Sequence, residues 1–306
     1  MFKIMPKFKA WYQASRPKMF TASLVPMGVA GLITIHDQIF NLSYFLLAVV
    51  GVFSLQTAAN LINEYYDYKR GAEEKKQAGQ SMVIKQALLS PKEVMLGAII
   101  TLVIGILIGL FFVINTGILV LIIGIGGVLV VITYTAGPFP LAYNGLGEIA
   151  VGLFMGPAIL IGTYFIMNPA MDYGRMISLF LISTPFMVLV AAILHANNIR
   201  DIDADRSVNK KTLAVRLGLE FARKEYAFLI GFAYISQLIL IIVGYIPVGT
   251  LLSFITLIQA RKLIHIFNTE TDPLKLHPAQ GQTAQLYGRF GLLVIVGWII
   301  QSIIIG

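Results

Sequence analysis

The sequence has no cysteine and few charged residues. Without cysteine, the chain can form no disulfide, hold no metal through a thiolate and use no cysteine nucleophile. Charged residues make up only 12% of the 306 residues, whereas hydrophobic residues make up 57%. A soluble domain carries about 25% charged residues, so this chain has too few to cover its surface in water. The composition therefore excludes a soluble protein and predicts an integral membrane protein.

Long apolar runs, bounded by turn or charged residues, predict nine membrane-spanning helices. We expect them at residues 20–36, 42–66, 93–114, 117–135, 148–167, 176–196, 226–244, 246–264 and 287–305. Helices are expected because lipid requires every backbone polar group to be paired within its segment. Residues 1–19 are basic and aromatic, which predicts a surface-lying segment rather than a cleaved signal peptide. Pro26, Pro157 and Pro185 are expected to kink their spans. The sequence thus predicts an all-α, polytopic membrane protein.

The basic residues predict the orientation of the chain. Of the 23 Lys and Arg residues, 22 fall on the side of the N-terminus, and only Arg175 falls on the other side. Because basic residues concentrate in cytoplasmic loops, this distribution predicts a cytoplasmic N-terminus and an external C-terminus. Topology then accounts for the net charge of +8, and no nucleic-acid partner is expected.

Most acidic residues lie in two predicted cytoplasmic loops, at about residues 60–92 and 195–224, which follow the second and sixth spans. Each loop contains Asn and Asp residues spaced four apart: Asn63 and Asp67 in the first, and Asn197, Asp201 and Asp205 in the second. On a helix that continues past the membrane surface, residues four apart lie on one face. The separation of the two loops by four spans also suggests an internal four-helix repeat.

Like charges at this spacing repel each other, and a bound cation would reverse the sign of that interaction. Oxygen ligands without Cys or clustered His favour Mg²⁺, which prefers one or two carboxylates together with waters and substrate phosphates. Basic residues lie among the acids and could stabilise a departing pyrophosphate: Lys69, Arg70, Lys85, Arg200, Lys210 and Lys211. The pattern favours a diphosphate held between the clusters. The alternative is a set of solvated caps at the ends of the spans.

These motifs resemble the UbiA superfamily of intramembrane prenyltransferases, and within it the menaquinone branch. The resembling stretches cover nearly the whole chain and lie at residues 14–18, 60–71, 134–141, 147–148 and 197–218. The resemblance implies a single domain over residues 1–306, with nine transmembrane helices around a central cavity that the motif loops cap on the cytoplasmic side. It also implies residence in the lipid of a prokaryotic cell membrane.

The resemblance also implies a reaction. Mg²⁺ binds a polyprenyl diphosphate, the allylic C–O bond ionises, and an electron-rich aromatic carbon attacks the cation. In the menaquinone branch the acceptor is the aromatic acid 1,4-dihydroxy-2-naphthoate, and the new bond replaces its carboxylate, which leaves as carbon dioxide. Carried over by position, the implied metal ligands are Asn63, Asp67, Glu73, Asn197, Asp201 and Asp205. Asp67, Asp201 and Asp205 are also the implied catalytic acids.

The chain departs from the broad superfamily pattern at several of these positions. Gly71 occupies the place of the third acid of the first motif, and Glu73 is the substitute two residues later. Glu64 stands where Asp is common, Lys85 where Arg is expected, and Asn209 where Gly is usual. The missing third acid argues against the 4-hydroxybenzoate and haem-type branches.

Several single residues have two interpretations. Glu148 either stabilises the start of its helix or acts in catalysis, by orienting the aromatic substrate or removing its proton. Tyr143 either stabilises an allylic cation through its ring or anchors the chain at the membrane interface. Lys210 and Lys211 contact the diphosphate or anchor the cytoplasmic side. His195 is expected to form hydrogen bonds at a helix end rather than to bind a metal.

Two other functions compete with this prediction. One is a prenyltransferase of another branch, with a different aromatic acid or a polar lipid as acceptor. The other is a secondary transporter, because intramembrane acids and repeats also mark ion pathways. A transporter places its ionisable residues near the middle of the bilayer, whereas here the acids crowd the cytoplasmic ends of the spans. This distribution favours a catalyst at the membrane interface.

Overall fold

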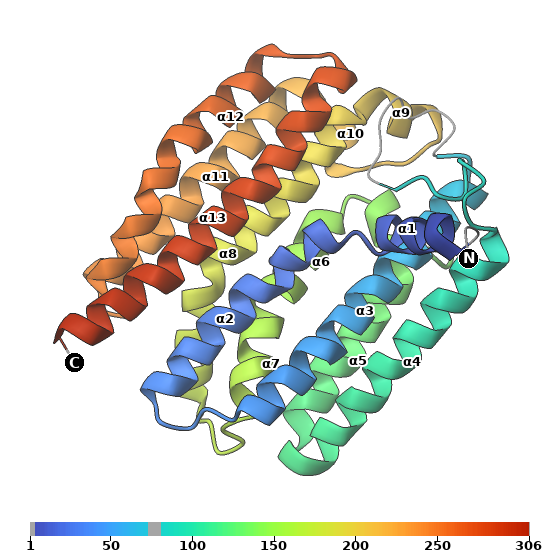
Figure 1. The fold of residues 1–306 in the computed structure, drawn as a ribbon. Coiled ribbons are helices and arrows are strands. Elements are labelled where there is room, and N and C mark those ends of the chain that lie inside the picture. The colour runs from blue at the N-terminus through green and yellow to red at the C-terminus, as the bar shows by residue number, and fades with distance from the viewer. Residues whose placement is uncertain (1–3, 73–80, 306) are drawn as a thin grey trace.

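The computed structural model describes residues 4–72 and 81–305, and every regular element in these ranges is a helix (Figure 1). The elements are α1 (Ile4–Ser15), η1 (Pro17–Phe20), α2 (Thr21–His36), α3 (Leu42–Lys69), α4 (Pro91–Thr116), α5 (Ile118–Thr133), η2 (Leu141–Tyr143), α6 (Gly147–Leu153), η3 (Phe154–Ala158), α7 (Ile159–Phe165), α8 (Tyr173–Arg200), α9 (Ile202–Ser207), α10 (Leu213–Leu217), α11 (Leu219–Ile242), η4 (Val248–Thr256), α12 (Leu257–Thr269) and α13 (Pro273–Ile305). The all-α prediction is confirmed.

Eight helical segments in the described part of the chain are long and apolar enough to cross a membrane. They are Lys7–His36, Leu42–Lys69, Pro91–Thr116, Gly147–Phe165, Tyr173–Arg200, Leu219–Ile242, Val248–Thr269 and Pro273–Ile304. The remaining expected span, at residues 117–135, is the apolar helix α5, which has only 16 residues. At 1.5 Å per residue, α5 is shorter than a bilayer core of about 30 Å. The order of the nine expected spans thus agrees with the structure, and the protein is a multi-pass membrane protein.

The long helices run side by side, with α8 deep in the bundle and α4 at its edge (Figure 1). The largest buried cluster joins α2, α8, α11 and α13 through large side chains such as Phe186, Tyr226 and Phe290. On α4, by contrast, Leu96, Ile99 and Leu107 are exposed. Apolar side chains on the outside of the bundle are stable only against lipid, because no hydrophobic penalty applies there.

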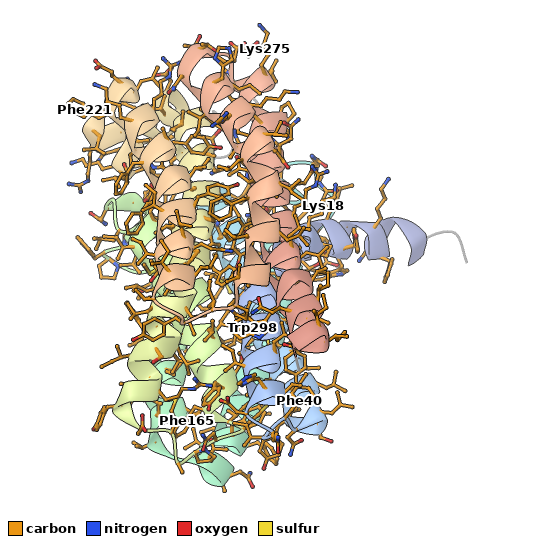
Figure 2. The ribbon with its side chains drawn as sticks, turned by 90° about the vertical axis from the view of Figure 1, so that its left-hand side faces the viewer. Lys18, Phe40, Phe165, Phe221, Lys275 and Trp298 are labelled. Carbon is orange, nitrogen blue, oxygen red and sulfur yellow. The ribbon has the colours of Figure 1, made fainter. Side chains whose placement is uncertain are left out.

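Helix α1 differs from the others in direction. Figure 2 shows it projecting sideways from the bundle, across the direction of the long helices. It buries Ala10 and Ala14 in a small core with α3 and α4, while Phe8 and Tyr12 remain exposed. This arrangement agrees with the surface-lying segment expected at residues 1–19, as far as that segment is described.

Proline has different effects at the three expected kinks. Pro157 lies in η3, a π-helical turn that separates α6 from α7, so the expected distortion is confirmed there. Pro26 and Pro185 lie inside α2 and α8, which continue through them. At η3 the chain also approaches α8 closely, because a Cβ added to Gly156 would lie 2.9 Å from the Cα of Met187.

Candidate active site

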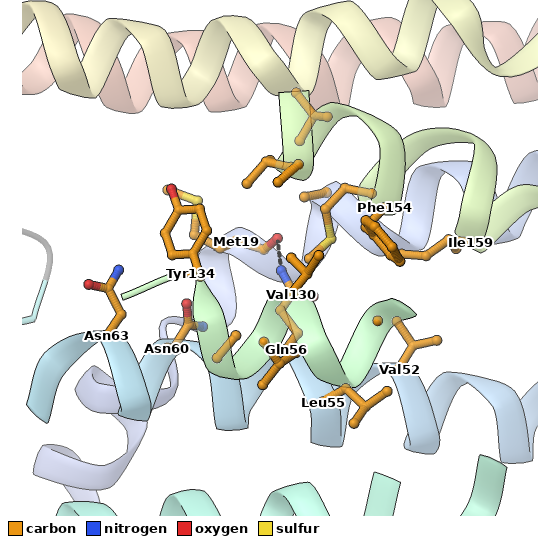
Figure 3. Close-up of a pocket in the computed structure, with 18 of the residues that line it drawn as sticks. Met19, Val52, Leu55, Gln56, Asn60, Asn63, Val130, Tyr134, Phe154 and Ile159 are labelled. Atoms are coloured by element: carbon orange, nitrogen blue, oxygen red, sulfur yellow. Dashed lines mark hydrogen bonds between the residues drawn. The ribbon is translucent and has the colours of Figure 1, made fainter. Parts of the chain in front are cut away.

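A cavity of about 390 Å³ lies inside the bundle, between α2, α3, α4, α5, the α6–α7 segment and α8. Its polar lining side chains include Arg16, Gln56, Asn60, Asn63, Asp67, Tyr134, Asn197, Asn198, Arg200, Lys210 and Gln280. Its apolar lining includes Val52, Leu55, Ile108, Phe112, Val130, Phe154, Ile159 and Ile166. Figure 3 shows Asn63 and Tyr134 at one end of this lining, and Val52, Phe154 and Ile159 at the other. The cavity therefore has a polar end at the two motifs and an apolar remainder.

The first acidic cluster lies on the last turns of α3. Asn63 and Asp67 both line the cavity, as residues four apart on one helix should. The hydroxyl of Tyr143 donates a hydrogen bond of 2.9 Å to Asp67 Oδ1. The side-chain oxygen of Asn63 is buried and has no hydrogen-bond partner among the described residues. A buried oxygen without a partner is costly, and a ligand would remove that cost.

Glu64 points away from this cluster and holds the loop that follows it. Its fully buried carboxylate accepts hydrogen bonds from the guanidinium of Arg16 at 3.2 Å and from the backbone N–H groups of Met82 and Ile84 at 3.3 and 3.4 Å. Glu64, expected only as a departure from the family pattern, thus connects α3 to Arg16, which directly follows α1, and to residues 81–84.

The second acidic cluster is organised by Arg200, which is 3% exposed. Its guanidinium donates to both carboxylate oxygens of Asp201 and to Asn197 Oδ1, each at 2.7 Å. A fourth contact, of 3.0 Å, joins it to Nδ1 of His277 on α13. The expectation that Asn197, Asp201 and Asp205 lie on one continuing helix is wrong. Helix α8 ends at Arg200, and α9 begins only after Asp201.

Lys210 joins the two clusters. Its ammonium group lies 3.6 Å from Asp205 Oδ1 and 5.2 Å from the ring centre of Tyr143, which in turn bonds to Asp67. Burial alone would lower the pKa of Lys210, but the carboxylates of Asp67 and Asp205 raise it above its ordinary value. Lys210 is therefore a buried cation between two acids that are distant in the sequence.

The other basic residues expected in the site do not line the cavity in the described part of the chain: Lys69, Arg70, Lys85 and Lys211. The guanidinium of Arg70 lies 4.6 Å from the Tyr143 ring centre and donates to the carbonyl of Gly137 at 3.1 Å. Lys69, Lys85 and Lys211 have exposed side chains. Lys211 nevertheless ties its loop to η2, because its backbone N–H donates to the carbonyl of Tyr143 at 3.1 Å. Glu73 lies outside the described residues.

Glu148 lies at the start of α6, but it is not a solvated helix cap. It is 4% exposed, and its Oε1 accepts a hydrogen bond of 2.8 Å from Asn198 Nδ2. The same oxygen lies 3.0 Å from His195 Nδ1, and His195 Nε2 lies 2.8 Å from the carbonyl of Ala222 on α11. The hydrogen-bonding role expected for His195 agrees with these contacts. Glu148 does not line the cavity itself; it lies behind Asn198, which does.

The donor chemistry of the polar end suits an oxygen-preferring metal ion. Carboxylate and amide oxygens of Asp67, Asn63 and Asn197 line the cavity, and no thiolate is present in the chain. In the described part of the chain, no group of three or more His, Asp or Glu side chains is placed to hold a metal. That is compatible with Mg²⁺, which needs only one or two carboxylates when a substrate phosphate supplies other ligands.

Several polar cavity residues were not singled out as site residues from the sequence, among them Arg16, Tyr134, Asn198 and Gln280. Arg16, Tyr134 and Asn198 lie within stretches that resemble the family, but no spacing rule marked them. Arg16 reaches the cavity because the backbone turns sharply between α1 and η1, where its φ is 53°. Gln280 lies on the long helix α13, seventy-four residues beyond the second cluster's Arg206, and local sequence carries no signal for it.

Comparison with known proteins identifies the family of the chain. The sequence profile of the UbiA prenyltransferase family matches residues 23–280. The chain belongs to this family. The 1,4-dihydroxy-2-naphthoate octaprenyltransferase of Bacillus subtilis (strain 168) is 31% identical over 290 residues, covering 95% of this chain and 92% of the relative. The enzyme of the same name from Escherichia coli (strain K12) is 28% identical, covering 94% of each chain. The protein is therefore a prenyltransferase, which disfavours the transporter alternative.

Solved structures show the same fold at low sequence identity. A UbiA homolog from Aeropyrum pernix K1 matches with a TM-score of 0.70 and 15% identity, covering 93% of this prenyltransferase and 98% of that chain. A UbiA homolog from Archaeoglobus fulgidus, solved bound to DMAPP and Mg²⁺, matches with a TM-score of 0.55 and 15% identity, covering 94% and 99%. These likenesses establish the helical fold.

Proposed function

We propose that this prenyltransferase transfers a polyprenyl group from an allylic diphosphate to 1,4-dihydroxy-2-naphthoate, with loss of carbon dioxide, as a step in menaquinone biosynthesis. The observation that carries the proposal is a single cavity whose polar end lies between two acidic motifs and whose remainder is apolar. A diphosphate suits the polar end and an isoprenoid tail suits the apolar end. The names of the Bacillus and Escherichia relatives support the choice of acceptor.

The polar end would hold the diphosphate together with Mg²⁺. Asn63 and Asp67 on α3, and Asn197, Asp201 and Asp205 around the end of α8, are the proposed ligands, with Glu73 as a further candidate. When bound, Mg²⁺ supplies positive charge that stabilises the leaving pyrophosphate. The Archaeoglobus homolog, solved with DMAPP and Mg²⁺, supports this assignment.

Lys210 and Arg200 are placed to add positive charge at the same point. Both line the cavity and both are buried, so their charges act where water screens little. In the present arrangement each is paired with an acid of the second cluster, Asp205 or Asp201. Asp201 and Asp205 are acids that would hold Mg²⁺, and Arg200 and Lys210 would then be free to contact the diphosphate. The cations then stabilise the charge that develops on the departing oxygen.

The proposed reaction balances without a further reactant. The allylic C–O bond breaks, and its electron pair stays on the pyrophosphate oxygen. A ring carbon of the naphthoate donates an electron pair to the allylic cation and forms the new C–C bond. The carboxylate on that carbon leaves as carbon dioxide, and its bonding electrons restore the aromatic ring. The apolar lining keeps water from the allylic cation, which would otherwise be hydrolysed.

The proposal includes the orientation in the membrane. The end of the bundle that carries α9, α10 and the end of α3 would face the cytoplasm, with the N-terminus on the same side (Figure 1). The distribution of Lys and Arg supports this orientation. A water-soluble diphosphate head group would then reach the polar end from the cytoplasm, while the tail stays within the bilayer.

The test uses the purified protein with Mg²⁺, an allylic polyprenyl diphosphate and 1,4-dihydroxy-2-naphthoate labelled in its carboxylate. The expected result is a prenylated naphthol without the carboxylate, together with labelled carbon dioxide and pyrophosphate in equal amounts. Chelation of Mg²⁺ should stop all three. A folded protein that prenylates 4-hydroxybenzoate or a polar lipid, but not the naphthoate, would contradict the proposed acceptor.

A further inference from the structure

The side chain of Asn198 is held in one orientation at the cavity wall. Asn198 lies near the end of α8, is 4% exposed and lines the cavity. Its Nδ2 lies 2.8 Å from Oε1 of Glu148, which comes from α6 and is itself buried. The amide group thus lies between the cavity and a buried carboxyl group.

Hydrogen-bond chemistry fixes which end of the amide faces Glu148. His195 Nε2 lies against the backbone carbonyl of Ala222, which can only accept, so Nε2 carries a proton. Two arrangements then satisfy the 3.0 Å contact between His195 Nδ1 and Glu148 Oε1. Either an imidazolium donates to a carboxylate, or a protonated Glu148 donates to a neutral imidazole. In both arrangements Glu148 Oε1 accepts from Asn198, so Asn198 must present its N–H there.

The amide oxygen of Asn198 is consequently left for the cavity. No group among the described residues donates a hydrogen bond to this oxygen. A metal ion or a hydrogen-bond donor could satisfy this oxygen. Consecutive helix residues point about 100° apart, and the side chain of the proposed metal ligand Asn197 bonds to Arg200, whereas that of Asn198 bonds to Glu148 on α6. We therefore expect a donor, rather than the metal, at Asn198. A diphosphate with bound metal offers acceptor oxygens, and an isoprenoid tail offers no polar group. Of the substrates proposed above, only the aromatic acceptor carries hydroxyl groups that can donate.

We propose that Asn198 Oδ1 accepts a hydrogen bond from a hydroxyl group of the aromatic acceptor, and that Glu148 is the positioning residue that turns this oxygen toward the cavity. The proposal rests on the proposed function for the identity of the acceptor. In 1,4-dihydroxy-2-naphthoate the 1-hydroxyl is adjacent to the carboxylate and donates to it internally. The 4-hydroxyl is therefore the group that Asn198 selects.

The first experiment compares 4-hydroxy-2-naphthoate and 2-naphthoate as competitive inhibitors of the full-length enzyme. With the wild type, the hydroxylated compound should bind about tenfold more tightly, the value of one hydrogen bond to a buried acceptor. Asn198→Leu, which keeps the size of the side chain, should reduce that ratio to about one and leave the KM for the prenyl diphosphate within about twofold. A ratio that stays at the wild-type value in Asn198→Leu would overturn the proposal.

The control is Asn115→Leu, the same substitution at the exposed end of α4, where the side chain donates to the carbonyl of Phe111. This variant should keep the wild-type ratio of inhibition constants. Thermal unfolding in detergent checks that each variant is folded. If Asn198→Leu does not fold, the Glu148 variants below test the same orientation.

The second experiment separates positioning by Glu148 from proton removal. Glu148→Gln retains an oxygen that accepts from Asn198 but loses the carboxyl group that faces His195, so the acceptor KM should rise less than in Glu148→Leu, without a larger loss of kcat. Glu148→Leu releases Asn198 and should raise the acceptor KM about tenfold. A large loss of kcat in Glu148→Gln with unchanged KM would assign Glu148 as a base and overturn the positioning role.

Failure of the proposed function would be visible separately. If the wild type turns over 4-hydroxybenzoate but no naphthoate, the acceptor assignment is wrong. The comparison is then made with 4-hydroxybenzoate and benzoate, and the Asn198 proposal requires the same loss of discrimination in Asn198→Leu. If the ratio is unchanged there as well, the Asn198 proposal is also wrong.

Discussion

The two acidic clusters have the same spacing in the sequence but different partners in the structure. In the first, Asn63 keeps a buried oxygen without a described partner, and Asp67 accepts from the neutral hydroxyl of Tyr143. In the second, the charged guanidinium of Arg200 bonds to both Asn197 and Asp201. Equal spacing therefore does not give equal electrostatics, because the partner comes from the surrounding fold.

This difference predicts different costs of mutation. In the first cluster, replacing Asp67 by Asn keeps an oxygen for Tyr143 and leaves Lys210 its neighbour Asp205, so it should affect catalysis more than stability. A substitution in the second also leaves a buried guanidinium without its counter-ion, so it should affect both. The following predictions test this contrast.

The largest effect on activity is expected for Asp67→Asn. This change removes a charge that faces the proposed diphosphate site, yet it keeps an oxygen for Tyr143. Turnover should fall about 100-fold or more, while the unfolding midpoint stays near that of the wild type. The matched control is Asp203→Asn, because Asp203 is 91% exposed and lies on the same stretch as the second cluster. Near-wild-type turnover in Asp67→Asn would refute its role as a metal ligand.

The next prediction concerns stability in the second cluster. Asp201→Ala should abolish turnover and also destabilise the protein by about 3 kcal/mol, because Arg200 loses its buried counter-ion. The double variant Arg200→Leu/Asp201→Leu should recover most of that stability without recovering activity. Chemical unfolding in detergent measures the stability of both variants, and an assay of prenyl transfer measures their turnover. Equal stability of Asp201→Ala and Asp67→Asn would remove the contrast between the clusters.

A smaller effect separates the two neighbouring lysines. Lys210→Gln should raise the KM for the prenyl diphosphate about tenfold, because Lys210 is buried between Asp67 and Asp205. Lys211→Gln should change it by about twofold at most, because an exposed charge is screened by water. Steady-state kinetics with varied diphosphate distinguish them. Equal effects would mean that Lys211 moves into the site when substrate binds.

The smallest effect is expected for Tyr143→Phe. The variant loses the 2.9 Å hydrogen bond to Asp67 but keeps the ring against Arg70 and Lys210. Turnover should fall about fivefold, the value of one hydrogen bond. A loss as large as that of Asp67→Asn would mean that Tyr143 has a direct part in the reaction, such as stabilising the allylic cation.

Much of the fold was predictable because hydrophobicity along the chain is a local signal. The nine expected spans have counterparts in order, although α13 begins at Pro273 rather than near residue 287. The predicted helix boundary was too late there because polar residues such as Gln280 are buried inside the bundle. The break in the helix at Asp201 was not predictable either, because spacing four apart is compatible with a continuous helix.

The candidate site was predictable as a set of residue types more than as a set of contacts. Of the residues that the sequence placed in the site, Asn63, Asp67 and Asn197 line one cavity. Asp201 and Asp205 are buried but do not line it; each pairs with a lining residue, Arg200 or Lys210. It did not reveal that Glu64 binds backbone N–H groups, or that Lys69 and Lys85 remain exposed. Whether a charged side chain on a helix end turns inward depends on what packs beside it, which the local sequence does not record.

The sequence by itself determined the membrane class, the helical architecture and the end of the bundle that carries the acids. These properties follow from the polarity of neighbouring residues, which each segment carries on its own. Only the tertiary structure decided that Lys210 joins Asp205 to the Tyr143–Asp67 pair, and that the amide nitrogen of Asn198 bonds to Glu148. Those contacts join α3, α6, α8 and the loop after α9, so they exist only once the helices pack and water leaves the site.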